Sequence, residues 1–103
     1  MTNTIFVKRH DNARVLADTL NYENGTPIDL TDATVVLIWN GERKSNVSIV
    51  NEATGEVSYI LTTEDVAESG TFELEWEITF ANQKQLSVPT SNRIVLRILP
   101  DQG

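Results

Sequence analysis

Three carboxylates, Glu73, Glu75 and Glu77, recur at every second residue of one short stretch. In an extended strand such side chains lie on one face, about 7 Å apart, which suits some paired-carboxylate glycosidase sites. The residues between them, Leu74 and Trp76, are apolar. The three carboxylates should therefore point to solvent, where no cleft or desolvation separates their pKa values. We interpret them as a solvated face.

Nucleophilic catalysis and zinc binding lack the residues that they need. His10 is the single histidine, no Gly-x-Ser-x-Gly sequence surrounds a serine, and cysteine is absent. Neither a Ser-His-Asp triad nor a zinc shell of nitrogen and sulfur ligands has local support. We interpret His10 as part of a polar connection, residues 9–12, between the first two strands.

Calcium is the remaining metal to consider. Asp29, Asp32 and the carbonyl groups of Asn24-Gly25 could supply oxygen ligands, but no Asp-x-Asp-x-Asn-Gly loop is present. Asp and Asn also form turns by bonding to nearby backbone, and we expect that role here. We assign no catalytic, cofactor-binding or metal-binding residue, and we predict that the chain is not an enzyme.

Trp39, Trp76 and Tyr59 could stack on sugar rings, as aromatic residues do in many carbohydrate-binding β-sandwich modules. Each alternates with aliphatic residues that would share its face, so the hydrophobic core is the favoured interpretation. A carbohydrate-binding module that recognises a host surface remains the alternative function.

The elements that carry these residues are strands. Phe72, Leu74, Trp76, Ile78 and Phe80 alternate with polar residues and predict a strand over 71–80 with one buried face. In residues 33–40 the side chains that would point to either face of a strand are apolar, which is typical of a central strand covered on both faces. Further strands are expected at 5–8, 14–22, 47–50, 56–61, 85–88 and 93–99, separated by turns rich in Asn, Gly and Asp.

Seven to eight short strands indicate an all-β sandwich or barrel. One helical turn is expected over 63–70, with Thr63 as N-cap and Gly70 as its end, and a bend is expected over 88–92 at Pro89. The predicted core contains Leu16, Leu20, Val35, Leu37, Trp39, Val57, Tyr59, Leu61, Phe72, Leu74, Trp76, Ile78, Ile94, Leu96 and Ile98.

Composition supports one folded domain. The chain has 103 residues, 40% of them hydrophobic and 22% charged, which fits one globular core over residues 1–99 with 100–103 as a tail or the start of a linker. A net charge of −7 disfavours nucleic acid as a partner. No apolar run is long enough to enter a membrane, and no signal peptide is apparent. Residues 51–77 contain eight acids and neither Lys nor Arg, a segregation that permits charge-complementary contacts within the domain or between proteins.

Residues 20–35, LNYENGTPIDLTDATV, resemble a segment near the start of phage baseplate upper protein N-terminal domains. Residues 55–61 (GEVSYIL), 70–76 (GTFELEW), and Pro89-Thr90 followed by Ile94-Val95-Leu96 are similar to later strands of that family. The resemblance spans roughly residues 4 to 99. Two departures are Asp32, where the family pattern has Gly, and residues 9–12, which replace a Gly-Asp-Thr-like sequence.

The resemblance implies an immunoglobulin-like antiparallel β-sandwich that serves as a non-enzymatic structural adaptor in the tail baseplate of a bacteriophage or prophage of Gram-positive bacteria. Its implied partners are other tail or baseplate proteins, with self-association as a second possibility. The protein would be made in the bacterial cytoplasm and reside in the virion. Family members continue into long downstream regions, so we expect this chain to correspond to their first domain or to a stand-alone relative.

Overall fold

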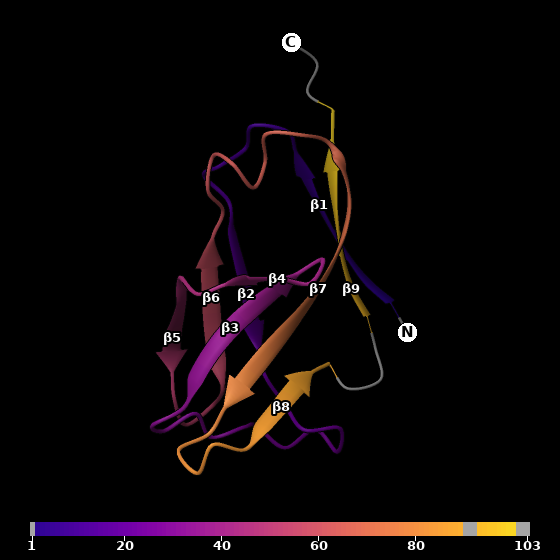
Figure 1. The fold of residues 1–103 in the computed structure, drawn as a ribbon. Coiled ribbons are helices and arrows are strands. Elements are labelled where there is room, and N and C mark those ends of the chain that lie inside the picture. The colour runs from indigo at the N-terminus through magenta and orange to yellow at the C-terminus, as the bar shows by residue number, and fades with distance from the viewer. Residues whose placement is uncertain (1, 90–92, 101–103) are drawn as a thin grey trace.

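A computed structural model describes residues 2–89 and 93–100 (Figure 1). These residues form nine strands, one of them unforeseen, and all are extended segments of three to ten residues. In chain order they are β1 (Thr2–Lys8), β2 (Val15–Thr19), β3 (Thr34–Trp39), β4 (Glu42–Lys44), β5 (Val47–Asn51), β6 (Glu56–Ile60), β7 (Gly70–Thr79), β8 (Gln85–Val88) and β9 (Arg93–Leu99). The all-β prediction is confirmed.

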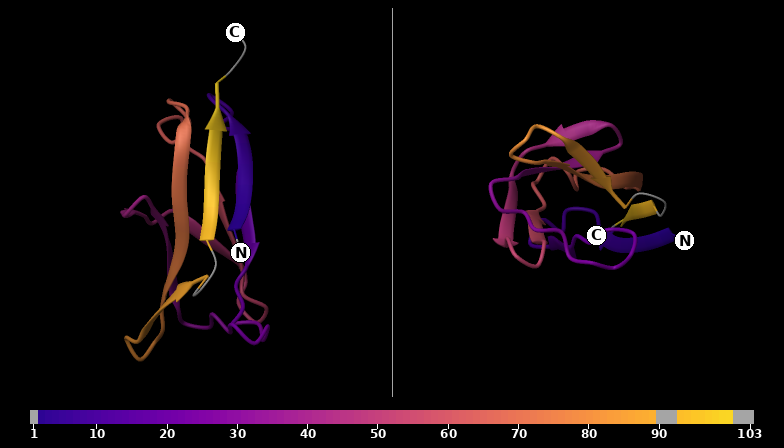
Figure 2. Two further views of the ribbon diagram at one scale, coloured as in Figure 1. Left: turned by 90° about the vertical axis from the view of Figure 1, so that its right-hand side faces the viewer. Right: turned by 90° about the horizontal axis from the view of Figure 1, so that it is seen from below.

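The strands form two sheets packed face to face (Figures 1 and 2). The larger sheet has six strands in the order β1-β9-β7-β3-β4, with β8 paired to β7, and the smaller sheet has three in the order β2-β6-β5. β1 and β9 run parallel, in register from Thr2 opposite Arg93 to Lys8 opposite Leu99. The expectation of an antiparallel sandwich is therefore confirmed only in part: the smaller sheet is antiparallel, but the larger is mixed because the first and last strands lie side by side in the same direction.

Strand β7 shows why the alternation in the sequence predicts its burial. Leu74, Trp76 and Ile78 are buried on the inner face, whereas Glu73 and Glu75 on the outer face are exposed. The side chains of successive strand residues point to opposite faces, so an alternating sequence fits a sheet with one face on the core. The predicted strand over 71–80 is confirmed to within one residue at each end.

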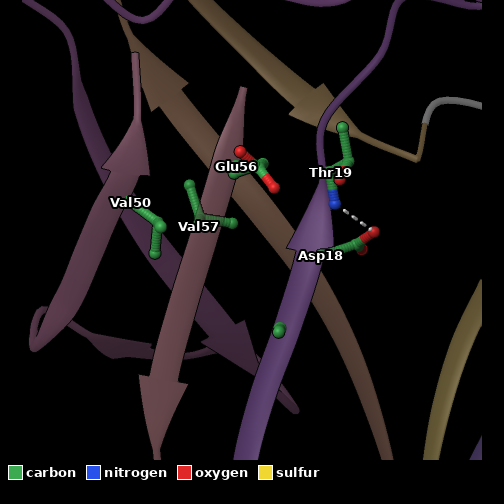
Figure 3. Close-up of a pocket in the computed structure, with 6 residues that line it drawn as sticks. Asp18, Thr19, Val50, Glu56 and Val57 are labelled. Atoms are coloured by element: carbon green, nitrogen blue, oxygen red, sulfur yellow. Dashed lines mark hydrogen bonds between the residues drawn. The ribbon is translucent and has the colours of Figure 1, made fainter. Parts of the chain in front are cut away.

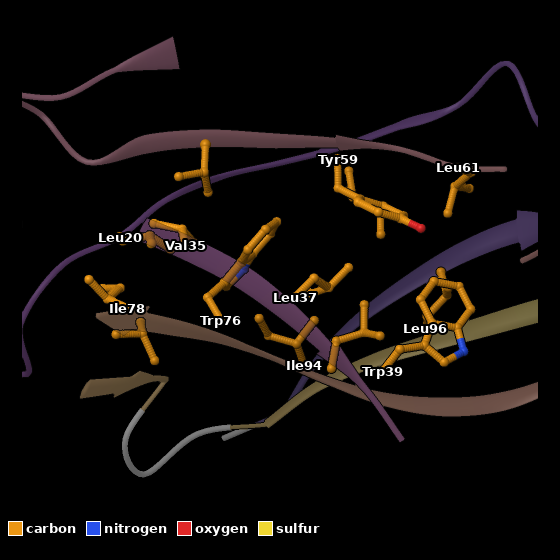
Figure 4. Close-up of a cluster of buried hydrophobic side chains, with 14 of the residues drawn as sticks. Leu20, Val35, Leu37, Trp39, Tyr59, Leu61, Trp76, Ile78, Ile94 and Leu96 are labelled. Atoms are coloured by element: carbon orange, nitrogen blue, oxygen red, sulfur yellow. The ribbon is translucent and has the colours of Figure 1, made fainter. Parts of the chain in front are cut away.

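The core lies between the two sheets, where side chains from both layers meet (Figure 4). Every predicted core residue is buried except Phe72, which is half-buried and packs against the Trp39 ring with the centroids 5.4 Å apart. The sequence analysis did not include five further core residues, namely Val7, Ile28, Leu30, Val66 and Val88.

The short strand β4 was missed, although its turn was foreseen. Asn40 and Gly41 have φ of 48° and 87° and connect Trp39 to Glu42, which face each other across the β3–β4 pair. Two residues with positive φ match the twist of a hairpin, and Asn-Gly is the sequence that favours them most. Because β4 itself is the charged triplet Glu42–Lys44, it has no apolar alternation to reveal it.

No helix occurs in the part of the chain that the structure describes, so the predicted helical turn over 63–70 is wrong. The segment is a turn that Thr62, not Thr63, begins. The Thr62 hydroxyl accepts a hydrogen bond from Asp65 N at 3.2 Å, and the Asp65 carboxylate accepts one from Thr62 N at 3.0 Å. This reciprocal pair resembles a helix capping box, but the chain then leaves for β7.

The loop between β2 and β3 closes one end of the sandwich. Leu20, Ile28 and Leu30 in this loop are fully buried. β2 ends at Thr19, three residues before the predicted end at residue 22. Backbone bonds fix the loop: Leu20 N donates to Gly55 O at 2.8 Å and Ile28 N to Leu20 O at 3.0 Å. Asp32, a departure from the family pattern, has φ of 58°, the left-handed conformation that Gly adopts easily and Asp tolerates.

Strand β8 ends at Val88, immediately before Pro89, as the predicted bend requires. The remainder of that bend, residues 90–92, and most of the predicted tail, residues 101–103, lie outside the described residues.

Candidate interaction surfaces

The three carboxylates of β7 lie on the outer face of the larger sheet, as predicted. Glu73 and Glu75 are exposed, whereas the Glu77 side chain is only 18% exposed. Arg43 of β4 lies 2.7 Å from Glu77 Oε1. On the neighbouring strand β9, Val95 lies opposite Glu73 in the register and Arg97 lies opposite Thr71. The side chain of Arg93 is outside the description.

His10 lies in the turn after β1 with φ of 71° and an exposed side chain. Its backbone N–H donates to Val66 O at 2.8 Å, which ties this turn to the loop that precedes β7. The interpretation of His10 as part of a connection between the first two strands is confirmed.

The acids considered for calcium form turns. Asp29 Oδ1 accepts hydrogen bonds from the hydroxyl of Thr31 at 2.6 Å and from its N–H at 3.0 Å, and both bonds lower the Asp29 pKa. Asn24 Oδ1 accepts from Thr26 N at 3.0 Å. Within residues 2–89 and 93–100, no group of three or more His, Cys, Asp or Glu side chains could hold a metal ion.

Trp39, Trp76 and Tyr59 are 6%, 2% and 3% exposed. They are core residues, as favoured by the sequence, and cannot present a stacking platform to a sugar. The described segments also contain no helix that could cross a membrane.

The most connected buried polar group is Asp65, whose side chain is 1% exposed. Its Oδ2 accepts a hydrogen bond from the Tyr59 hydroxyl at 2.6 Å, and its Oδ1 lies 3.2 Å from Lys44 Nζ. Lys44 also lies over the Trp39 ring, 5.6 Å from its centroid. A buried carboxylate is tolerated when hydrogen bonds and a cation surround it, and this cluster therefore joins β4 to β6 as a structural anchor.

The pKa directions agree with that role. Burial alone would raise the Asp65 pKa, but the donors Tyr59, Thr62 and Lys44 outweigh it and hold the pKa below its usual range. Burial, together with the nearby Asp65 carboxylate, raises the Tyr59 pKa strongly. Asp65 stays ionised and Tyr59 protonated at neutral pH, so neither group is poised for proton transfer.

A second polar contact crosses the sandwich. Trp76 Nε1 of β7 donates to Asp18 Oδ2 of β2 at 3.1 Å, and Thr19 N donates to Asp18 Oδ1 at 2.8 Å. Burial raises the Asp18 pKa, although both hydrogen bonds oppose the shift.

The two outer faces of the sandwich differ in charge. The outer face of the larger sheet carries Lys8, Arg43, Glu73, Glu75, Glu77 and Arg97. The outer face of the smaller sheet, which we call the β2–β6–β5 face, consists of Val15, Ala17, Thr19, Ser48, Val50, Glu56, Ser58 and Ile60. Glu56 is its single ionisable residue.

The whole described chain resembles one family of phage tail proteins. The model of the BppU N-terminal domain, the first domain of the phage baseplate upper protein, matches residues 2–101. The chain belongs to the BppU N-terminal domain family. A search of curated proteins found no match. As a BppU N-terminal domain it is a structural, non-enzymatic protein of the phage baseplate, located in the virion tail and interacting with other tail or baseplate proteins.

One residue of the BppU-like pattern has a clear physical reason. Gly55, which opens the GEVSYIL segment, has φ of 75° and is buried. A Cβ there would lie 2.5 Å from Leu20 O and 2.9 Å from Ile28 O, the carbonyls of the loop that closes the sandwich. Only glycine permits this approach.

Sequence reasoning missed Arg43, Lys44 and the bonding roles of Asp18 and Asp65. The Asn40-Gly41 hairpin signal could have revealed β4 and with it both cations. For Asp18, a polar residue between the strand residues Ala17 and Thr19, no local signal distinguishes a cross-sheet acceptor from an exposed acid.

Proposed function

We propose that the domain is an adaptor that docks within the tail baseplate through protein surfaces, without a catalytic, cofactor or metal site of its own. The family match over residues 2–101 carries the proposal. In support of the proposal, the residues that could have acted in catalysis or binding have structural roles. Asp65 anchors β4 to β6, Asp29 forms a turn and Trp76 lies in the core. The partner is another baseplate protein, and the chain is made in the host cytoplasm.

The test is to locate the chain in purified phage particles by cross-linking mass spectrometry and immunogold electron microscopy. Cross-links to tail proteins and label at the tail tip are expected. A chain that is absent from intact particles but abundant in the host lysate would contradict the proposal.

We infer further that residues 1–99 form one folding unit with the immunoglobulin-like connectivity that the family resemblance implies. One cooperative unfolding transition, coincident by circular dichroism and tryptophan fluorescence, is expected. Two separate transitions would contradict a single unit, and an experimental structure would test the connectivity.

A further inference from the structure

The β2–β6–β5 face carries an exposed, uncharged apolar pair at one end. Val15 lies directly opposite Ile60 in the β2–β6 register, and their side chains are 49% and 64% exposed. Ala17 and Ser48 both lie opposite Ser58 in the next row. A domain of net charge −7 thus keeps most of one sheet face free of charge, and depletion of charged residues is the compositional mark of an interface centre.

A hollow of about 390 Å³ lies at the other end of this face. It is lined by Ala17, Asp18, Thr19, Val50, Glu56 and Val57, which come from all three strands of the smaller sheet (Figure 3). Val50, at an irregularity in the β5–β6 register, is 64% exposed. The lining thus combines aliphatic walls with the Glu56 carboxylate, whereas the Asp18 carboxylate turns inward and accepts from Trp76 Nε1. A side chain with an aliphatic stem and a cationic head, Lys or Arg, complements it.

We propose that this face is the docking surface for a different tail protein, whose contact patch has an apolar region at one end and, at the other, a Lys or Arg side chain that enters the hollow. The inference rests on the proposed adaptor function and names the surface through which it acts. The apolar pair contributes affinity because Val15 and Ile60 lose water on contact. The acidic end fixes the orientation because a cation is accepted there and an anion is repelled.

A second copy of this chain does not complement the face. In a two-fold pair, an axis parallel to the strands places Glu56 near the Glu56 of the other copy. An axis across the strands places Glu56 against the Val15–Ile60 pair of the other copy. The first arrangement opposes like charges and the second buries an unpaired carboxylate on apolar side chains, and both are unfavourable.

The test uses tails purified from a phage mutant that lacks this chain, to which the full purified chain is added back, with saturable binding measured by biolayer interferometry. Ile60→Glu, which places a charge in the apolar Val15–Ile60 pair, should weaken binding about tenfold or more, since 1.4 kcal/mol is a factor of ten. Thr71→Glu, at an exposed position on the outer face of the larger sheet, is the matched control and should change affinity less than about twofold. Glu56→Gln should weaken binding and reduce its dependence on salt.

Thermal melts of each variant separate docking from folding. Should Ile60→Glu unfold the chain, amide hydrogen exchange of the wild type replaces it, with protection on tail binding expected over residues 15–19 and 56–60. Unchanged binding of Ile60→Glu, loss of binding by Thr71→Glu, protection confined to β7, or a concentration-dependent dimer that Ile60→Glu abolishes would each overturn this surface while leaving the adaptor function intact. Failure of the wild type to bind tails saturably would overturn both.

Discussion

The indole N–H of Trp76 donates a hydrogen bond of 3.1 Å to the Asp18 carboxylate, and this bond joins the centre of the larger sheet to an edge strand of the smaller one. Trp76 is 2% exposed, so its N–H has no access to bulk water as an alternative acceptor. The bond therefore aligns the two layers at a cost, because it holds a charge in a partly buried position.

Asp18→Ala and Asp18→Asn should differ in stability. The alanine variant leaves the indole N–H without an acceptor and should lose about 1–3 kcal/mol of unfolding free energy. The asparagine variant keeps an acceptor without the charge and should match or exceed the wild type at pH 7. Because burial raises the Asp18 pKa above its usual 3.8, this group favours folding below that pH and loses its contribution as pH rises through the raised value. Urea melts at pH 3 to 7 measure both effects, and an alanine variant as stable as wild type would contradict the first.

Trp76→Ala should lower the unfolding free energy by about 3–5 kcal/mol, because the truncation leaves a large cavity between the sheets. The matched control is Phe6→Ala in β1, whose aromatic side chain is 53% exposed and should contribute less than about 1 kcal/mol. Chemical denaturation followed by far-UV circular dichroism gives both values. Equal losses at the two positions would show that Trp76 is not a core residue in solution.

Asp65→Asn should destabilise the domain at pH 7 by about 3 kcal/mol, since it removes the buried anion opposite Lys44. The lowered pKa of Asp65 means that its stabilisation is present above the ordinary value of 3.8 and is lost as pH falls through that value toward the folded pKa. The gap between wild type and variant should narrow accordingly in melts below pH 4. Glu64→Gln, at the exposed neighbouring position, should stay within about 0.5 kcal/mol of wild type throughout. A gap independent of pH would contradict the ionised state of Asp65.

Replacement of Glu73, Glu75 and Glu77 together by Gln should leave the fold intact, with the loss concentrated at Glu77. A double-mutant cycle on Glu77→Gln and Arg43→Met should give a coupling of about 0.2–1 kcal/mol that shrinks in 1 M salt, because Arg43 is 58% exposed. Glu75→Gln, paired with the same Arg43→Met, is the control and should show a smaller coupling, because the ion pair of Arg43 is with Glu77. A carboxylate of this trio that titrates near neutral pH by NMR would revive the hydrolase interpretation.

Gly55→Ala should cost about 3 kcal/mol or more, because the added methyl group collides with two loop carbonyls that cannot both move away. Gly41→Ala is the control with a similar φ of 87° and nothing within 4 Å of the new Cβ, so it should show only the strain of the left-handed conformation, about 1–2 kcal/mol. Melting temperatures of the two variants decide the matter, and equal values would mean that the contact at Gly55 relaxes freely.

Much of the fold could be predicted because its strands alternate sharply. In β7, the alternation of apolar residues such as Leu74 and Trp76 with polar residues predicts one buried face. The parallel β1–β9 pair could not be predicted, since either direction satisfies the same alternation and the choice depends on how distant segments meet. The absence of a helix after Thr62 has a similar cause: the capping signal is genuine, but Asp65 and Val66 are buried and hold the chain in a turn.

The candidate surface was less accessible to sequence reasoning. The charge segregation over residues 51–77 indicated only that acidic side chains could take part in contacts. The contrast between the outer faces, however, depends on which strands share a sheet. Val15 and Ile60 are far apart in the chain and become neighbours only through the β2–β6 register. A face that is characterised by the absence of charged residues has no sequence motif by which it could be predicted.

The parallel alignment of β1 and β9 has a mechanical consequence. The start of β1 and the end of β9 lie at opposite ends of the same strand pair, in a molecule 47 Å long. Tension applied between those two points slides one strand along the other, so the hydrogen bonds of the ladder bear the load together. A hairpin pulled from its adjacent ends would instead open one bond at a time. A pull between these two points therefore loads the β1–β9 ladder in shear.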